Sequence, residues 1–361
     1  MRSFLRHFKA LHLWLLGCAA ALGLFYALRG QKPLMTALAE GFSMPLEQWL
    51  GRALAPVPFS VAELCYAAAV VFAVEFPVRT AVLLLRREYR LETLYRRLLL
   101  LADLLLTVWA LFCLLWGVNF YAEDFCDKSG IYPEPVAYDD LAAVTRLFAE
   151  KAAEYAPQVP RTEGGLYSVP RQETLDAAPA LYQRLYGEFP FLALPEDPRP
   201  KPIFFSKVMS AMNVTGLYFP FTGESNLNMD FPAATFPFTV AHELAHRRGI
   251  ASEQQCNFLG VLAATRSEDP AWAYSGWLTG LIHLTNALYR VDRDAVVKLS
   301  AALPEEVLAD LDVNNAYWQR WEGPVSDVSG KAYDKMLRGY GDELGMKSYG
   351  AVVDLLVAYY K

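Results

Sequence analysis

The sequence predicts a membrane-anchored protein with three transmembrane helices near the N-terminus, followed by a mainly helical α+β domain with a small sheet. Three observations predict this class. The 361 residues are 54% hydrophobic and only 20% charged, whereas soluble domains average roughly 45–50% and about 25%. The apolar excess is concentrated before residue 120. The remainder, 121–361, has the spacing and turn signals of one folded domain outside the membrane.

Three apolar stretches predict the membrane-spanning helices, at residues 10–28, 59–85 and 98–118. The first has no formal charge, and a helix of this length crosses a hydrocarbon core of ~30 Å. It is too long for a typical cleavable signal peptide, and the residues directly after it do not form a small-residue cleavage site. We therefore expect a retained helix.

Carboxylates inside the second and third stretches raise the alternative of a transporter. Glu63 and Glu75 lie in the second stretch, and Asp103 lies in the third. The alternative is that Glu63 and Glu75 lie near opposite membrane interfaces and Asp103 lies near the basic end. Ionisable groups in membrane helices are commonly functional or paired. Isolated carboxylates without a repeated architecture are weak support for transport. A transporter of this kind would work without residues 121–361.

Basic residues predict the orientation. Three precede the first stretch, and six arginines separate the second from the third: Arg79, Arg86, Arg87, Arg90, Arg96 and Arg97. Few basic residues lie between the first two stretches or directly after the third. The positive-inside rule then places the N-terminus in the cytoplasm and residues 121–361 outside the cytoplasmic membrane.

Within residues 121–361, apolar spacing predicts helices over 139–155 and 174–189 and a short strand over 202–206. Residues 216–228 alternate between aromatic and small polar residues, with a turn at Thr222 and Gly223. This pattern predicts a hairpin. Pro237 suits the first turn of a helix, so the next helix is expected to begin there.

Residues 271–289 carry no charge and could form a fourth span. However, Ser275, Thr279, His283 and Asn286 recur every three or four residues and form a polar stripe. A helix facing lipid would lack such a stripe, so we expect a core helix of the domain.

The charge and cysteine content exclude several classes of protein. The net charge of -6 gives no electrostatic support for binding nucleic acid. Five cysteines are too few and too scattered for a disulfide framework. Cys126 and Cys256 are the two that lie outside the apolar stretches, and a disulfide between them is left open outside the cytoplasm.

Residues 242–246 carry the pattern His-Glu-x-x-His. Positions i and i+4 share one face of a helix, so His242 and His246 can direct two imidazoles at a single metal ion. Glu243 is then placed to take a proton from a water molecule that the ion polarises. This chemistry hydrolyses peptide bonds. The alternative is an amphipathic helix with two ordinary histidines.

A catalytic zinc ion usually takes three protein ligands. Glu253 is the best candidate for the third, because Gly249 can end the first helix and Ser252 can cap a second helix that returns toward the histidines. The alternative for Glu253 is an ordinary carboxylate in a first helical turn. His283 and Asp230 are the other candidate ligands. Asn257, one turn after Glu253, is expected to hydrogen-bond a ligand.

The sequence resembles a known group at these residues. The motif at 242–246, followed by EQQCNFLG at 253–260, is similar to gluzincin-type zinc metallopeptidases. The segments MSAMNVTGLYFPFTGESNLN, FPFTVAHELAHRRGIASEQQCNFLG and KSYGAVVDLLVAYYK together resemble the bacterial membrane family called domain of unknown function 3810. The resemblance implies N-terminal spans before a zincin-like domain. The chain departs from the pattern at Gln255 and Cys256, neither of which is an inferred ligand.

Two further features of such a peptidase cannot be assigned to single residues. Residues 216–228 are the candidate edge at which a substrate peptide would pair as an added strand, with a plain buried hairpin as the equal alternative. A group that stabilises the oxyanion is also required. The candidates for this role are Tyr218, Tyr317, Tyr333, Tyr349 and Arg338.

The sequence thus predicts a membrane-tethered zinc-dependent peptidase with His242, His246 and Glu253 as zinc ligands and Glu243 as the catalytic base. Its expected partners are a peptide or protein substrate and the lipid bilayer. The alternative is a non-catalytic sensor or scaffold that contains zinc. The substrate, its cleavage preference and the oligomeric state do not follow from the sequence.

Overall fold

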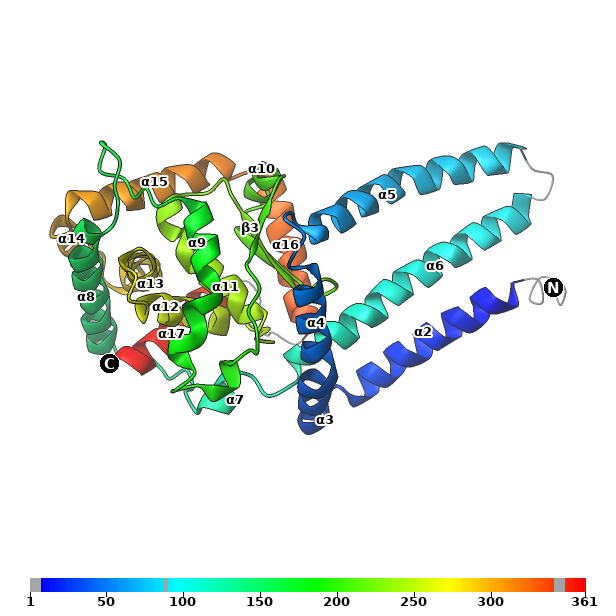
Figure 1. Cartoon of the computed structure of the whole chain (residues 1–361), viewed down its shortest axis with the longest axis horizontal. Coiled ribbons are helices and arrows are strands. Elements are labelled where there is room, and N and C mark those ends of the chain that lie inside the picture. The colour runs from blue at the N-terminus through cyan, green and yellow to red at the C-terminus, as the bar shows by residue number, and fades with distance from the viewer. Residues whose placement is uncertain (1–7, 87–89, 341–347) are drawn as a thin grey trace.

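The computed structural model describes residues 8–86, 90–340 and 348–361. Figure 1 shows a mostly helical domain with three long helices extending from one of its ends. These are α2 (Lys9–Leu28), α5 (Val61–Arg86) and α6 (Arg90–Leu115). Each is long and apolar enough to cross a membrane, and in α2 and α5 almost no side chain is buried. The three apolar helices predicted from the sequence are therefore present.

The third helix differs from the predicted stretch 98–118. It begins eight residues earlier, at Arg90, and ends at Leu115, and the short 3-10 helix η2 (Gly117–Phe120) follows it. The polar first two turns of α6 extend the helix beyond its apolar part. The apolar pattern therefore located the span but not the helix ends. Hydropathy indicates which residues favour the hydrocarbon core of a membrane, not where the helical backbone begins or ends.

The segment between α2 and α5 is helical, which the sequence did not indicate. It contains α3 (Lys32–Leu38), the π-helix η1 (Ala39–Ser43) and α4 (Met44–Leu54). Gly51 of α4 packs against the backbone of Gly223: a Cβ at residue 51 would lie 2.7 Å from the Gly223 carbonyl oxygen. Contacts with the sheet thus cross the predicted domain boundary at residue 120.

The sheet has three strands in the order β1-β3-β2: β1 (Lys201–Ile203), β2 (Gly216–Phe219) and β3 (Glu224–Asn228). β2 and β3 form the predicted antiparallel hairpin, with Tyr218 opposite Ser225. Its turn contains Gly223 at φ +66°, a value that favours glycine. β1 pairs parallel to β3, so β2 is an edge strand.

Helices make up most of the rest of the domain. The predicted helix 174–189 is instead α9 (Arg171–Ala177) continued by the 3-10 helix η4 (Ala178–Leu185), where Pro179 removes a backbone donor. The remaining elements are α7 (Phe125–Ser129), α8 (Tyr138–Tyr155), η3 (Ala156–Gln158), η5 (Pro190–Leu192), α10 (Ser206–Ala211), η6 (Ala233–Thr235), α11 (Phe236–His246), α12 (Glu253–Thr265), α13 (Pro270–Val291), α14 (Arg293–Ala301), α15 (Glu305–Trp321), α16 (Pro324–Gly339) and α17 (Ser348–Tyr360).

α13 lies in the centre of this domain and packs against α8, α12 and α17. It corresponds to residues 271–289, and it is a core helix as expected rather than a fourth candidate span. Ser275 on its polar stripe is fully buried and accepts a hydrogen bond from the backbone N–H of Phe238, at 3.0 Å. The stripe thus holds the start of α11 in place.

The first turn of α5 is joined to the sheet by a buried carboxylate. Glu224 of β3 accepts hydrogen bonds from the backbone N–H groups of Val61 and Ala62, at 3.3 and 2.9 Å, and pairs with Lys201 at 2.6 Å. A carboxylate at the N-terminus of a helix is favoured by the helix dipole. The sheet and α5 are therefore fixed relative to each other.

Candidate metal centre

His242 and His246 lie one turn apart on α11, all of whose residues are buried. Gly249, at φ +76°, ends this helix as expected, and Ser252 precedes the first residue of α12 without a side-chain capping bond. α12 therefore starts with Glu253 next to the histidine face. This is the local geometry that the spacing predicted.

The two imidazoles and the carboxylate converge. The Nε2 atoms of His242 and His246 are 3.1 Å apart, and they lie 3.3 and 3.5 Å from the Glu253 carboxylate oxygens. One ligand atom from each residue falls within 4.8 Å of the others. All three residues are buried, with exposed fractions of 8% or less. Among the described residues this is the group that could hold a metal ion.

The tautomer of His246 follows from its surroundings. Its Nδ1 donates to the backbone carbonyl oxygen of Ile250, at 2.8 Å, because a carbonyl can only accept. Nε2 then faces Glu253 and His242. Hydrogen bonds of this kind orient a histidine for metal binding. By contrast, Nδ1 of His242 has no hydrogen-bond partner among the described residues.

His246 and Glu253 shift the pKa of each other. Burial alone would raise the pKa of Glu253, but His246 and His242 lower it well below its ordinary range. Burial opposes protonation of His246, yet Cys256 and Glu253 raise the pKa of this imidazole well above its usual value. An ion pair therefore holds the cluster together. A divalent cation would replace the shared proton, and two imidazoles with one carboxylate are a donor set suited to zinc.

Glu243 lies beside this cluster against the edge strand β2. Its pKa is raised by burial, with His242 and His246 opposing the rise, and the backbone N–H of Tyr218 donates to its carboxylate. Its Oε2 has no partner among the described residues. A Cβ at Gly216 would lie 2.4 Å from the other oxygen, so only glycine leaves room for this carboxylate.

The two alternative ligands lie outside the cluster. The ring of His283 on α13 packs near Phe238, with ring centroids 6.3 Å apart. Asp230 accepts a hydrogen bond from the hydroxyl of Tyr317, at 2.8 Å. Neither residue belongs to the group of convergent ligands among the described residues.

The residues around Glu253 differ in part from expectation. The expected hydrogen bond from Asn257 to a ligand is not seen, and its Nδ2 has no partner in the described part of the chain. Cys256 and Cys126 are both free thiols, so the disulfide left open by the sequence is not formed. The thiol of Cys256 lies 3.3 Å from Nδ1 of His246. Gln255 instead accepts from the backbone N–H of Phe125, at 3.0 Å.

The oxyanion candidates are distributed over different surroundings. Tyr333 of α16 donates to Glu253 and is the one that reaches a ligand. The hydroxyl of Tyr218 donates to Glu47 at 3.1 Å, whereas Arg338 pairs with Asp334 at 2.8 Å. The hydroxyl of Tyr317 donates to Asp230, as described above. The side chain of Tyr349 lies outside the described residues.

Two residues near the centre were missed by sequence reasoning. Trp116, directly after α6, packs edge-on against His246 with ring centroids 5.7 Å apart, and against Tyr218 at 5.3 Å. Glu47 of α4 is buried, which raises its pKa well above the ordinary value. No local pattern marks either residue, since their partners are distant in the sequence.

A buried ion-pair cluster holds the end of α11. Asp197 accepts from Arg247 at 2.7 Å and from Arg248 at 2.6 Å, and all three side chains are almost fully buried. Arg248 also donates to the carbonyl oxygens of Leu192 and Leu244, at 3.0 and 2.8 Å. The two arginines thus position the turn between the histidines and Glu253.

Comparison with known proteins identifies a family but no characterised relative. No match was found among curated proteins or among solved structures. A family model described as "Protein of unknown function (DUF3810)" matches residues 39–357, which covers most of the chain, including α5, α6 and the whole candidate metal centre. The chain therefore belongs to the DUF3810 family.

Proposed function

We propose that this protein is a membrane-tethered zinc-dependent peptidase with a zincin-like catalytic domain. The observation that carries the proposal is the convergence of His242, His246 and Glu253, with Glu243 beside them. A water-activating metal site of this type uses three protein ligands and keeps one position for water or substrate. The ligands are buried and held by α11 and α12, as a preorganised site requires.

Each residue has a defined task in this proposal. His242, His246 and Glu253 hold the ion. A bound zinc ion supplies Lewis-acid activation of a water molecule. Glu243 accepts the proton of that water and passes it to the leaving amine. Tyr333, whose hydroxyl already lies at the centre, is the best-placed oxyanion donor among the four candidates whose side chains the structure describes.

The proposed orientation places the catalytic domain outside the cytoplasm. It rests on the arginines that separate the second and third predicted spans and on the three helices that could cross a membrane. The substrate in this proposal is a peptide or protein on the outer side of the cytoplasmic membrane.

A second candidate is a non-catalytic sensor or scaffold that contains zinc. One observation favours it: α16 links the centre to the membrane helices. Tyr333 in the middle of α16 contacts Glu253, and Tyr340 directly after the helix packs on Phe112 of α6, with ring centroids 5.3 Å apart. In this candidate function, metal binding at the centre changes the position of α16, and α16 transmits the change to α6.

The experiment that separates the two candidates uses the full chain in nanodiscs. Zinc content is measured together with digestion of a peptide library, for the wild type and for Glu243→Gln. If the protein is a peptidase, both forms should bind zinc, and Glu243→Gln should lower turnover by about 10²–10⁴-fold. Glu268→Gln, at a glutamate whose side chain is 80% exposed, is the matched control and should change neither.

One result would contradict the role of Glu243, and another would contradict the peptidase itself. If Glu243→Gln keeps its zinc and hydrolyses the library as the wild type does, Glu243 is not the base. If zinc-loaded wild type cleaves no peptide, the sensor or scaffold replaces the peptidase.

A further inference from the structure

The connection between β1 and β2 exposes an unusual amount of apolar surface. In residues 204–212, which include α10, the exposed fractions are 85% for Phe204, 54% for Phe205, 56% for Val208 and 41% for Met212. Single exposed apolar residues are common on soluble proteins, but contiguous ones mark a site of interaction. We call residues 204–212 the apolar connection.

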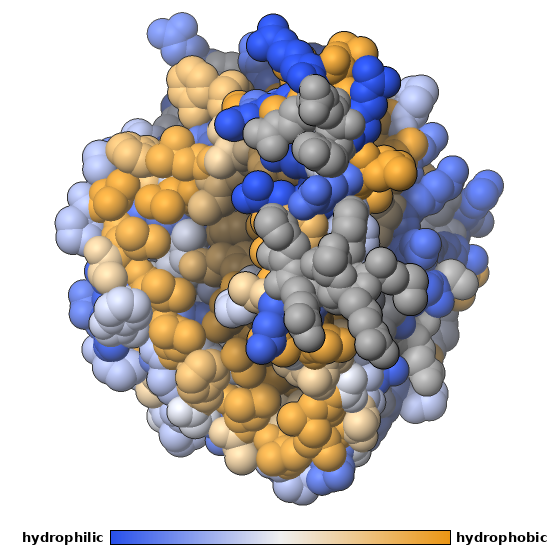
Figure 2. Space-filling view, turned by 90° about the vertical axis from the view of Figure 1, so that its right-hand side faces the viewer, coloured by the Kyte–Doolittle hydropathy of each residue, from blue (hydrophilic) through white to orange (hydrophobic). Residues whose placement is uncertain are grey.

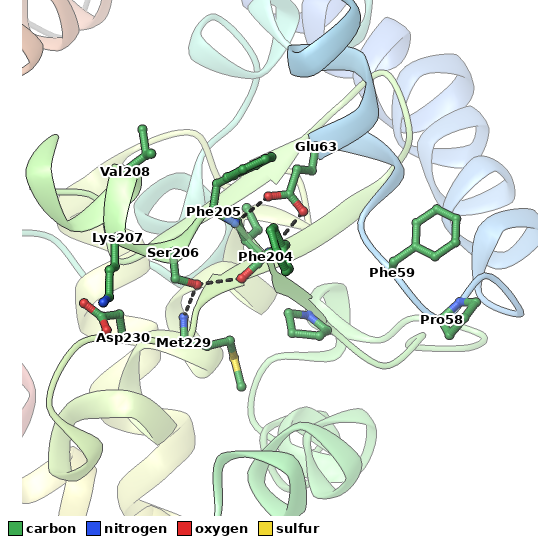
Figure 3. A pocket seen from close by; sticks show the side chains of 12 residues that line it. Pro58, Phe59, Glu63, Phe204, Phe205, Ser206, Lys207, Val208, Met229 and Asp230 are labelled. Carbon is green, nitrogen blue, oxygen red and sulfur yellow. Dashed lines mark hydrogen bonds between the residues drawn. The ribbon is translucent and has the colours of Figure 1, made fainter.

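The apolar connection is fixed to the first turn of a candidate membrane helix. The carboxylate of Glu63, in the first turn of α5, accepts hydrogen bonds from the backbone N–H groups of Phe204 at 3.0 Å and Phe205 at 2.7 Å. Figure 3 shows both bonds. These two hydrogen bonds stabilise the carboxylate of Glu63 at this position, so its presence near the span does not require a role in transport. They also place the two phenylalanines level with the beginning of the span.

A hollow lies between the apolar connection and the beginning of α5. It has a volume of about 650 Å³ and is lined mainly by apolar side chains, including Phe59, Ile203 and Met229. Lys207 is exposed and lies at this hollow with Asp230 (Figure 3). A mainly apolar hollow beside a lysine is complementary to a phospholipid. The apolar side chains would contact the acyl chains, and the lysine ammonium group would contact the phosphate.

Other exposed aromatic residues are found at the same end of the membrane helices. Tyr26 near the end of α2 and Trp109 near the end of α6 contact each other edge-on, with ring centroids 6.1 Å apart. Tyr66 near the start of α5 and Phe59 just before it are 48% and 50% exposed. Figure 2, which faces the side of the molecule with the three long helices, shows hydrophobic side chains gathered there around a hollowed surface. Aromatic side chains are enriched where membrane helices cross the membrane–water interface.

We propose that the apolar connection is a fourth membrane contact, which inserts Phe204, Phe205 and Val208 among the lipid acyl chains next to α5. Lys207 reaches the lipid phosphates. The occupant of this surface is the bilayer itself, because the surface continues the lipid-facing side of α5 and is held there by Glu63. This contact is independent of whether the metal centre hydrolyses peptides.

Membrane contact here would also fix the height of the metal centre above the bilayer. The apolar connection leads directly into β2, whose Tyr218 N–H donates to the Glu243 carboxylate. The catalytic domain is then held at the bilayer by its own surface as well as by its three helices. It cannot swing away from the membrane as a domain on a flexible linker could.

The test uses three exposed valines of the full chain in nanodiscs of phosphatidylethanolamine and phosphatidylglycerol. A photo-cross-linking p-benzoylphenylalanine replaces Val208, Val71 or Val297, which are 56%, 66% and 63% exposed, so that none disturbs the core. Val71 lies within α5, and Val297 lies on α14 at the opposite end of the domain (Figure 1). Adducts are identified by mass spectrometry.

We expect lipid adducts at positions 208 and 71 and none at position 297. Lipid adducts at 71 alone would overturn the proposal, because residue 208 would then face water like residue 297. Adducts of residue 208 with a second protein chain instead of lipid would also overturn it and would assign the surface to a protein partner.

Discussion

The candidate metal centre is built from two kinds of helix, and the contrast shows which part of it is fixed. α11 is buried at every residue, and α12 is buried at every residue except Thr265, whereas α16 has one buried residue, Leu337. Yet α16 supplies Tyr333, which donates to Glu253. The candidate ligands therefore belong to the buried core, and the tyrosine that contacts Glu253 from outside belongs to a helix with little buried surface. Segments with little buried apolar surface open at low free-energy cost.

The space around glycine residues also differs between the core helices and α16. A Cβ at Gly280 of α13 would lie 2.2 Å from the Phe148 ring, and one at Gly276 would lie 2.8 Å from the Ala264 Cβ. At Gly330 of α16 there is no atom within 4 Å of that position in the described residues. Close helix packing thus requires glycine at these two positions of the core, whereas Gly330 of α16 has open space beside it.

The largest effect is expected at the ion-pair cluster that holds the end of α11. Asp197→Asn leaves two buried guanidinium groups without their counter-charge, and removing one partner of a buried ion pair costs about 3–5 kcal/mol. The free energy of unfolding, measured by urea titration in detergent, should fall by this amount. Asp176→Asn is the control, because Asp176 pairs with Arg199 at the surface, where such a pair contributes about 0–1 kcal/mol. Equal losses for both variants would mean that the core cluster adds no more stability than a surface pair.

A matched pair of glycine substitutions gives the next largest effect. Gly280→Ala overpacks the contact between α13 and Phe148 and should destabilise the protein by about 1–3 kcal/mol. Gly330→Ala removes the backbone freedom of a glycine inside α16 and should stabilise it by about 0.5–1 kcal/mol. Thermal unfolding followed by circular dichroism measures both. A loss of stability for Gly330→Ala would show that α16 packs more closely than its exposed surface indicates.

Local patterns were enough to predict the part of the site that lies within one short segment. The His-Glu-x-x-His spacing, the Gly249 turn and the start of α12 all lie within twelve residues, and helix geometry alone brings their side chains together. The polar stripe of α13 similarly predicted a core helix, and the turn at Gly223 predicted the hairpin. In each case the sequence period and the backbone conformation carry the information.

The remaining contacts connect residues that are far apart in the sequence. Trp116 meets His246, Asp197 meets Arg247 and Arg248, and Tyr333 meets Glu253 only after the chain has folded. No periodicity records such pairs. The position of Glu63 near one end of its span allowed an interfacial location as the alternative to transport. Its two partners, the backbone N–H groups of Phe204 and Phe205, are more than 140 residues away and had no such signal.

The smallest effect is expected for Tyr333→Phe, and it tests the contrast between α16 and the core most directly. Loss of one hydrogen bond to a buried charged group costs about 1.5–3 kcal/mol. The cost for Tyr333→Phe should be smaller, because α16 can rearrange around the lost contact. Because Leu337 is the one buried residue of α16, hydrogen exchange measured by mass spectrometry should rise in peptides of α16 and stay unchanged in peptides of α11 and α12. Tyr317→Phe on α15, which removes a hydroxyl bonded to Asp230, is the control and should leave α16 unchanged. Faster exchange throughout α11 and α12 would instead mean that α16 is part of the rigid frame, and that the ligands depend on it for their positions.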